Sequence, residues 1–323
     1  MILPYLRGLL SPRTAPATWA LVALNVFVYL GTLSAYESSQ IRLDAILDEP
    51  SFVARQGLVF AQLIEREPQL FSASLGLMRA RAQKGDPEAR DLLGALALRN
   101  AQFVAHAGTY AFEGDEIAIA SWRKRFIAAT ALQSEHPSYR WGLSHLNASG
   151  RNWITYQFAH SGFMHLALNM AFLLIFGVFV ETRLGSSLVV LCYVFSGVAG
   201  AFAFTRLTGL TASPLVGASA AVSGLGGLVA VHCGRERIPF FFFVLPIQGY
   251  MGLRSFPAWL ILLLFSVPDL AGFLSGVPDV SGVAYAAHLG GAAFGALMAG
   301  LLRLGLLAAD PYDPEKGWGI FDG

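Results

Sequence analysis

Six stretches of the sequence are apolar, almost free of charge, and close in length to a helix that crosses a bilayer. About 20 residues suffice for such a span, because an α-helix rises ~1.5 Å per residue. With 55% of the 323 residues hydrophobic and only 13% charged, the composition excludes an ordinary soluble protein. We therefore predict an all-α membrane protein whose six transmembrane helices lie at about 15–36, within 152–180, at 184–205, within 207–234, at about 257–272 and at 280–302.

The segment between the first two spans has a different composition. It holds 12 of the 22 Lys and Arg residues, and its polar and apolar positions alternate as in amphipathic helices over 52–64, 86–104 and 117–132. Asp86 precedes Pro87, which predicts a helix that begins there with Asp86 as its N-cap. The predicted domains are residues 1–36 as a cytoplasmic N-terminus and first transmembrane helix, 37–150 as an extramembrane, mainly helical insert, 151–304 as transmembrane helices two to six, and 305–323 as a cytoplasmic C-terminal tail.

Basic residues in the short loops predict the orientation, because cytoplasmic loops carry an excess of Lys and Arg. Both termini are expected in the cytoplasm, and the insert is expected outside. The run Ile238–Leu253 contains Pro239, Pro246 and Gly249, which predicts an interfacial segment rather than another span. The basic residues assigned to the cytoplasmic side are Arg7, Arg13, Arg183, Arg235, Arg237, Arg303 and Lys316, against Arg206 on the other side.

Charge and cysteine content limit the partners. The net charge of +1 gives no indication of nucleic-acid binding. Cys192 and Cys233 lie in apolar runs and belong to no metal-ligand spacing, so we expect neither a metal nor a cofactor. The partner that the composition predicts directly is the lipid bilayer.

Four polar side chains of the even-numbered spans reach a similar depth. Ser219 lies about seven residues into span four and His288 about eight into span six, while His165 and Asn169 lie about seven and eleven into span two. All three helices enter from the outer face, so Ser219, His165 and His288 lie roughly 10–12 Å below it. Asn169 follows one turn deeper. Polar groups are costly at this depth and indicate a functional site.

These residue types suit acyl transfer. A serine hydroxyl is a weak nucleophile until a base takes its proton, and His288 is the candidate base for Ser219. The His165 ring, the Asn169 amide and the Ser219 backbone N–H are candidate donors to an oxyanion. No acidic residue lies inside spans two, four or six, so we predict a Ser–His dyad rather than a triad.

Small residues surround both candidate groups. Gly291 and Gly295 follow His288, and Gly224 and Gly227 follow Ser219. Helices with such residues can approach until their backbones nearly touch. The spacing therefore predicts close contact between spans four and six, which would let the short serine side chain reach the histidine.

These motifs resemble those of the rhomboid family of intramembrane serine proteases. Gly217-Ala218-Ser219 is similar to the family's Gly-x-Ser motif, and Ala287 to Gly291 to its Ala-His-x-x-Gly motif. His160, His165 and Asn169 match its His-x-x-x-x-His-x-x-x-Asn motif. Glu181 and Arg183 match its Glu-x-Arg.

The resemblance implies a six-helix rhomboid-like bundle with the insert between helices one and two. It also implies that Ser219 is the nucleophile, His288 the general base, and His165 and Asn169 the oxyanion donors. His160, Gly217, Gly291, Glu181 and Arg183 would support them. The activity implied is endopeptidase cleavage of single-span membrane proteins near the outer face. The location implied is a multi-pass protein of a membrane, and we expect the bacterial inner membrane.

Three departures from the family's pattern leave alternatives open. Ala220 stands where the family usually has Gly, Ser223 stands where some members have Tyr, and Trp153-Ile154 replaces a common Trp-Arg pair. One alternative is a catalytically inactive rhomboid-like protein that binds client transmembrane helices. A second alternative, which does not depend on these departures, is a small transporter or channel, which would be expected to carry intramembrane acids or an internal repeat.

Overall fold

The computed structural model describes residues 2–4, 12–144, 149–208, 213–243, 251–275 and 284–310. The chain divides into two compact units. The core unit comprises residues 1–30, 150–208 and 215–323, and the insert unit comprises residues 31–149 and 209–214.

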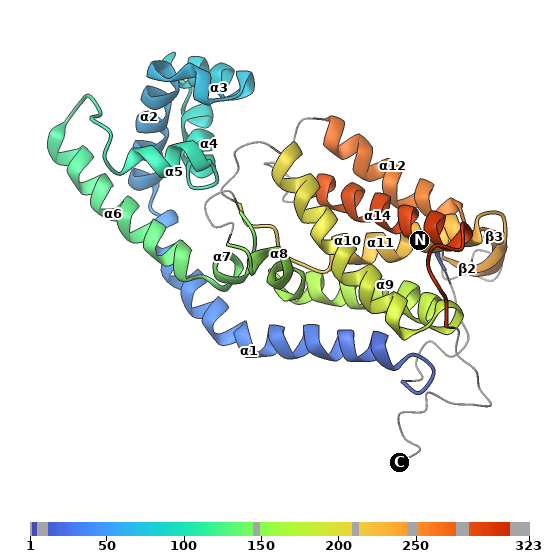
Figure 1. The fold of residues 1–323 in the computed structure, drawn as a ribbon. Coiled ribbons are helices and arrows are strands. Elements are labelled where there is room, and N and C mark those ends of the chain that lie inside the picture. The colour runs from blue at the N-terminus through green and yellow to red at the C-terminus, as the bar shows by residue number, and fades with distance from the viewer. Residues whose placement is uncertain are drawn as a thin grey trace. The chain divides into compact units, whose positions relative to one another are not determined.

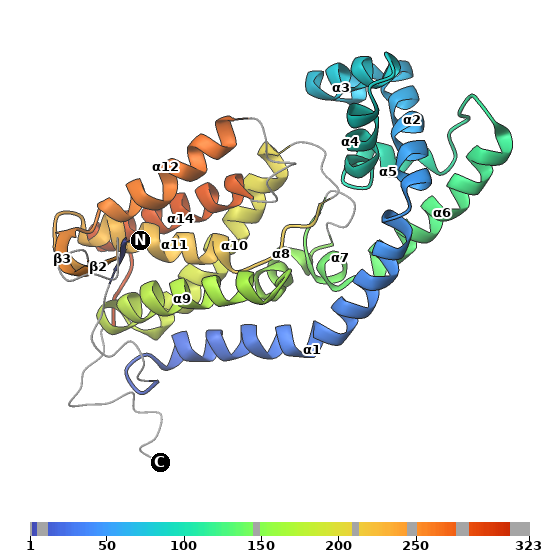
Figure 2. The ribbon, with the colours of Figure 1, turned by 180° about the vertical axis from the view of Figure 1, so that it is seen from behind.

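Helices make up most of the core unit (Figures 1 and 2). The helix α1 (Pro16–Leu47) begins there and ends in the insert unit. In the described part of the chain, four helices, α1, α9, α10 and α14, are long and apolar enough to cross a membrane, so the protein is a multi-pass membrane protein. After α1, the described helices of the core unit are α8 (Asn152–Thr155), η2 (Tyr156–Phe158), α9 (Phe163–Leu184), α10 (Ser186–Leu207), α11 (Ser219–Cys233), α12 (Leu260–Leu274) and α14 (Tyr285–Arg303).

Each of the six predicted spans corresponds to one helix, with differences at the ends. The first is longer than predicted, because α1 continues to Leu47. The fourth and fifth, α11 and α12, have 15 residues each, which is short for a full crossing. Part of the predicted sixth span, residues 280–283, lies outside the described residues.

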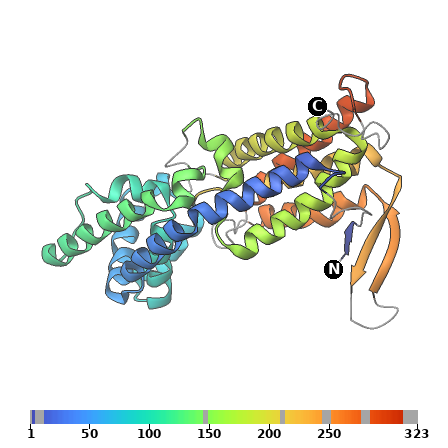
Figure 3. The same cartoon turned by 90° about the horizontal axis from the view of Figure 1, so that it is seen from below.

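A small antiparallel sheet corrects the all-α prediction (Figure 3). Its order is β1 (Ile2–Pro4), β2 (Arg237–Phe243) and β3 (Met251–Pro257), with Arg237 opposite Pro257 and Phe243 opposite Met251. Ile and Phe, which dominate β2, favour extended backbone. The run expected as an interfacial segment is therefore a pair of strands, whose connection at 244–250 lies outside the described residues.

Glu181 ties α1 to the end of α9. Its buried carboxylate accepts hydrogen bonds from the backbone N–H groups of Ala17 and Thr18, at 2.9 and 2.7 Å, and from the Thr18 hydroxyl at 2.7 Å. The first N–H groups of a helix have no partner within the helix, and its N-terminus attracts negative charge. The Ser186 hydroxyl donates to the same carboxylate at 2.6 Å, so one side chain joins α1, α9 and α10.

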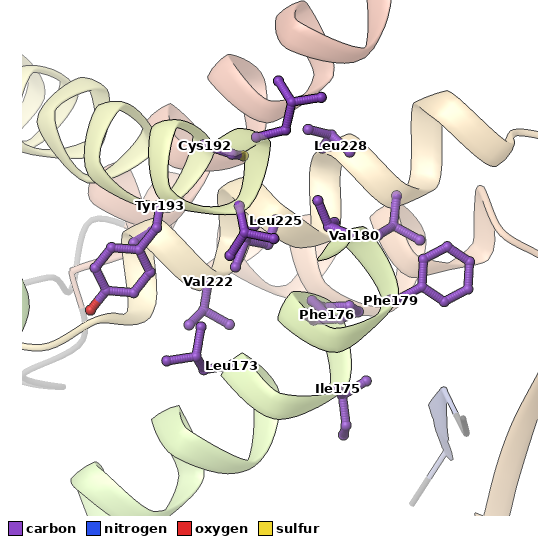
Figure 4. Close-up of a cluster of buried hydrophobic side chains, with 14 of the residues drawn as sticks. Leu173, Ile175, Phe176, Phe179, Val180, Cys192, Tyr193, Val222, Leu225 and Leu228 are labelled. Carbon is purple, nitrogen blue, oxygen red and sulfur yellow. The ribbon is translucent and has the colours of Figure 1, made fainter. Parts of the chain in front are cut away.

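The centre of the core unit is apolar (Figure 4). Leu173 and Phe176 of α9, Tyr193 of α10, and Leu225 and Leu228 of α11 are buried together. A helix that is apolar on every side suits such a position, and α11 packs against α9, α10 and α14. This packing holds the first turn of α11, where Ser219 lies, in a fixed place.

Glycines allow α11 and α14 to approach closely. A Cβ atom placed on Gly295 would lie 1.8 Å from the Gly224 carbonyl oxygen, and one on Gly291 would lie 2.0 Å from that of Ala220. A Cβ on Gly227 would lie 2.3 Å from the Ala292 oxygen. The predicted close contact between spans four and six is confirmed, because at these positions the two backbones leave no room for a methyl group.

The insert unit is a helical unit with its own core. Phe60, Leu63, Leu93, Phe103 and Trp122 are among its buried side chains. Its helices after α1 are α2 (Pro50–Arg66), η1 (Pro68–Leu70), α3 (Ala73–Gln83), α4 (Pro87–Ala97), α5 (Ala101–Ala107), α6 (Glu116–Glu135) and α7 (Pro137–Trp141).

Local signals explain where the insert helices begin. Asp86 caps α4 as predicted, since its carboxylate accepts from the N–H groups of Glu88 and Ala89 at 3.0 and 3.2 Å. The helix predicted over 86–104 is divided into α4 and α5, because the Asn100 side chain caps a new helix by accepting from the N–H of Phe103 at 2.9 Å. α2 and α4 cross closely, and a Cβ on Gly57 would lie 2.0 Å from the Arg90 carbonyl oxygen.

Candidate active site

Ser219 is the first residue of α11, and a glycine-dependent turn presents it. Gly217 has a φ of +109°, a conformation that side chains with a Cβ rarely adopt. A Cβ there would also lie 2.7 Å from the His165 ring. The Gly217 N–H donates to the Tyr156 carbonyl oxygen at 2.9 Å, which fixes the turn to the segment before α9. Glycine at 217 therefore brings Ser219 and His165 together.

His288 lies in the first turn of α14 and faces Ser219. Its Nε2 atom is 2.9 Å from the Ser219 Oγ atom, a normal hydrogen-bond distance. The two residues are 69 positions apart in the sequence, and the glycine-lined contact of α11 with α14 brings them together. A serine hydroxyl that is hydrogen-bonded to an imidazole nitrogen has the geometry of an activated nucleophile.

Asp269 extends this pair, which the sequence reasoning missed. Both of its carboxylate oxygens lie 3.1 Å from His288 Nδ1, so serine, histidine and aspartate form one continuous chain of contacts. The sequence predicts a dyad of Ser219 and His288, and the structure places the carboxylate of Asp269 beside that histidine. The acid lies on α12, the fifth span, whereas the prediction considered acids in spans two, four and six alone. The available signal was an ionisable residue in an apolar run, which indicates a functional site by default.

The two proposed oxyanion residues lie on α9 close to the serine turn. His165 Nδ1 is 3.0 Å from the Ser161 hydroxyl, and the ring's Nε2 atom is directed towards Gly217. The Asn169 amide donates to the His165 carbonyl oxygen at 3.0 Å and also faces Gly217. Both side chains therefore lie on the Ser219 side of α9, as their spacing predicts.

His160 lies behind the serine turn. Its Nε2 atom accepts from the N–H of Ala218 at 3.4 Å, and its Nδ1 atom is 3.3 Å from the Phe158 carbonyl oxygen. It makes ring contact with His165 at a centroid distance of 5.2 Å. These contacts stabilise the turn and the position of His165 rather than placing His160 against the hydroxyl.

A cavity of about 320 Å³ opens at these residues, between α9, α11, α12 and α14. Its wall is largely apolar and includes Phe172, Phe176 and Phe265, whose rings meet edge to face between α9 and α12. The polar part of the wall consists of His165, Asn169, Ser219, Ser223, Ser266, Asp269 and His288. An apolar hollow with a few converging polar groups is typical of a site that binds and orients a ligand.

Glu181 and Arg183 act separately in this structure. Glu181 caps α1, as described above. Arg183 pairs with Glu236, with Nη1 2.7 Å from Oε1, and its guanidinium lies 4.3 Å from the centre of the Phe179 ring. Both contacts join structural elements of the core unit and leave the cavity to other residues.

The departures at Ala220 and Ser223 have structural counterparts. The Ala220 methyl group fits because residue 200 on α10 is glycine, and a Cβ there would lie 2.6 Å from that methyl group. Ser223 lines the cavity. The ring of Tyr285, three residues before His288 on α14, lies against Gly272 of α12.

Among the residues that the structure describes, no three His, Cys, Asp or Glu side chains gather into a group that could hold a metal ion. The chemistry available at the cavity is that of a hydroxyl, an imidazole and a carboxylate, with amide and ring N–H donors beside them.

The comparison with protein families agrees with this geometry. Residues 148–304 match the family described as the rhomboid domain. No curated protein matches the sequence. The matched segment includes Ser219, His288, His165 and Asn169, together with Asp269. The chain therefore carries a rhomboid domain, which spans residues 148–304.

Proposed function

We propose that the protein is an intramembrane serine endopeptidase that cleaves transmembrane helices of single-span membrane proteins near the outer face. The observation that carries the proposal is the 2.9 Å contact between Ser219 Oγ and His288 Nε2 at the wall of the cavity. A rhomboid domain supports membrane helices as the class of substrate or client. The proposed location is the bacterial inner membrane, with the N-terminus in the cytoplasm and residues 37–150 as the extramembrane insert.

The proposed reaction has two steps. His288 takes the hydroxyl proton of Ser219 as the oxygen attacks the scissile carbonyl carbon, which gives a tetrahedral intermediate. The His165 ring, the Asn169 amide and the Ser219 backbone N–H stabilise the negative oxygen of that intermediate. His288 then donates the proton to the amine nitrogen as the C–N bond breaks, leaving an acyl group on Ser219. Water, activated by the same histidine, releases the second fragment.

The site also constrains the substrate. A peptide bond inside a helix has its N–H and C=O groups engaged, so the substrate helix must unwind locally before Ser219 can attack it. Exposed backbone at membrane depth is tolerated where it lines a water-filled cavity, and water is also a reactant here. Substrates with helix-destabilising and small residues at the cut are therefore expected to react faster.

A labelling experiment tests the proposal. Detergent-purified protein is incubated with a fluorophosphonate, and a model single-span substrate is offered in liposomes. We expect labelling and cleavage by the wild type, neither by Ser219→Ala, and little of either by His288→Ala. Folded wild type that takes no label and cuts no tested substrate would instead support the alternative, an inactive rhomboid-like protein that binds client helices.

A further inference from the structure

The position of the Asp269 carboxylate, inside an apolar stretch, is energetically unfavourable. Asp269 lies inside α12, an otherwise uncharged helix, and its side chain is 18% exposed, similar to the 19% of the His288 side chain. Ionisable groups in membrane helices are costly and are retained where they have a partner. In the described part of the chain, the hydrogen-bonding partner of this carboxylate is His288 Nδ1, reached by both oxygens at 3.1 Å.

This contact determines which nitrogen of His288 carries the proton. An ionised carboxylate has no hydrogen to donate, so Nδ1 must donate to Asp269. In the neutral imidazole, Nε2 then has a free lone pair and accepts the hydroxyl proton of Ser219 at 2.9 Å. The opposite tautomer would place an N–H against the serine, and the base could not take its proton. When His288 becomes positively charged during the reaction, the adjacent carboxylate also stabilises that charge.

A second contact, one turn further along α12, holds the two helices at this distance. Gly272 of α12 packs against the Tyr285 ring of α14, and a Cβ on Gly272 would lie 2.5 Å from that ring. Asp269 and His288 each lie three residues away from these positions, so the two contacts are stacked on the facing sides of α12 and α14. The glycine therefore supports the distance at which the carboxylate meets the imidazole.

We propose that Asp269 is a positioning residue that fixes the tautomer and orientation of His288, which makes the site a serine–histidine–aspartate arrangement spread over three membrane helices. This inference rests on the proposed function. The proposed function assigns the chemistry to the helices that carry the nucleophile and the base. The inference about Asp269 assigns part of the reaction rate to α12, which carries neither.

The experiment compares Asp269→Asn, Asp269→Glu and the control Glu236→Gln, which makes the same acid-to-amide change in the exposed pair with Arg183. The rate of fluorophosphonate labelling measures activation of Ser219 independently of binding of a helical substrate. Cleavage in liposomes gives kcat and KM separately. Loss of the aspartate in other serine–histidine–aspartate enzymes costs about 10⁴-fold in kcat, and we expect a loss of at least ~100-fold here.

The expected pattern is specific to positioning. Asp269→Asn lowers the labelling rate and kcat together and leaves KM within about twofold of the wild type. Asp269→Glu labels and cleaves at least about tenfold faster than Asp269→Asn. Glu236→Gln behaves as the wild type. If Asp269→Asn labels and cleaves within about twofold of the wild type, the inference is overturned while the proposed function stands. Wild type that takes no label overturns both.

A variant that leaves the carboxylate in place serves as a control for effects on folding. Gly272→Ala places a methyl group 2.5 Å from the Tyr285 ring, and if the ring keeps its place α12 moves and the labelling rate falls in the same direction as for Asp269→Asn. Gly300→Ala is its control, because nothing lies within 4 Å of a Cβ at that position of α14. Asp269 variants that do not fold, beside a folded Gly272→Ala, would assign Asp269 to stability and refute positioning.

Discussion

Replacing Gly291 by alanine should separate the nucleophile from its base. A methyl group there would lie 2.0 Å from the Ala220 carbonyl oxygen, so the helices must part by about 1.4 Å to reach the 3.4 Å of ordinary contact. The clash lies at the residue directly after Ser219 and one turn after His288. The same displacement applied to their 2.9 Å contact gives up to about 4 Å, beyond hydrogen-bond range. A misplacement of about 1 Å can cost about 100-fold in rate, and overpacking costs about 1–3 kcal/mol in stability.

The assay is the initial rate of fluorophosphonate labelling for the wild type, Gly291→Ala and Gly300→Ala, with thermal unfolding in the same detergent. We expect a loss of about 100-fold for Gly291→Ala and none for Gly300→Ala, which makes the same change on the same helix where no atom is near. Labelling of Gly291→Ala within about threefold of the wild type would refute the reasoning. It would mean that α11 and α14 can part without moving Ser219 from His288.

Three further predictions concern stability. Glu181→Ala removes the partner of the first N–H groups of α1 and should lower the free energy of unfolding by about 1–3 kcal/mol, measured by denaturation in detergent. Gly57→Ala forces a methyl group onto the Arg90 carbonyl oxygen and should speed proteolysis within the insert unit, whereas Gly76→Ala, which meets no atom within 4 Å, should not. Burial lowers the pKa of His136, opposed by a smaller effect of Asp44. The unfolded chain therefore binds the proton first, and stability should fall as pH drops below about 6.5. His136→Asn should remove this dependence, and an equal pH slope in the melting temperatures of both proteins would contradict it.

The helices of this fold were predictable because membrane spans and N-caps are local signals. Apolar runs predicted six of the core helices, α1, α9, α10, α11, α12 and α14, and Asp86 with Pro87 predicted the start of α4. The strands β2 and β3 were not predicted, because a short apolar run with prolines fits an interfacial segment as well as a hairpin. The pairing that decides between them joins residues such as Arg237 and Pro257, 20 positions apart.

Part of the candidate site was predictable because it also depends on local signals, namely the spacing of small residues and the depth of each polar side chain along its helix. Small residues after Ser219 and His288 indicate that two helices can touch, and the depth of each side chain follows from helical rise. Asp269 was missed because depth was compared only among spans predicted to enter from the outer face. The approach of α12 to α14 depends on Gly272 lying under the Tyr285 ring, a contact between two residues that carries no periodic signal in the sequence.

The carboxylate of Glu181 also sets an order of events during synthesis. The N–H groups of Ala17 and Thr18 precede it by 164 and 163 positions, so their partner does not exist when the first membrane helix leaves the ribosome. At about 5–20 residues per second, this interval lasts roughly 8–30 s. Residues 31–149 of the insert unit, which contain its buried cluster, are synthesised within this interval. The start of α1 must therefore remain hydrated until α9 arrives, and the membrane core can close only after the insert has been made.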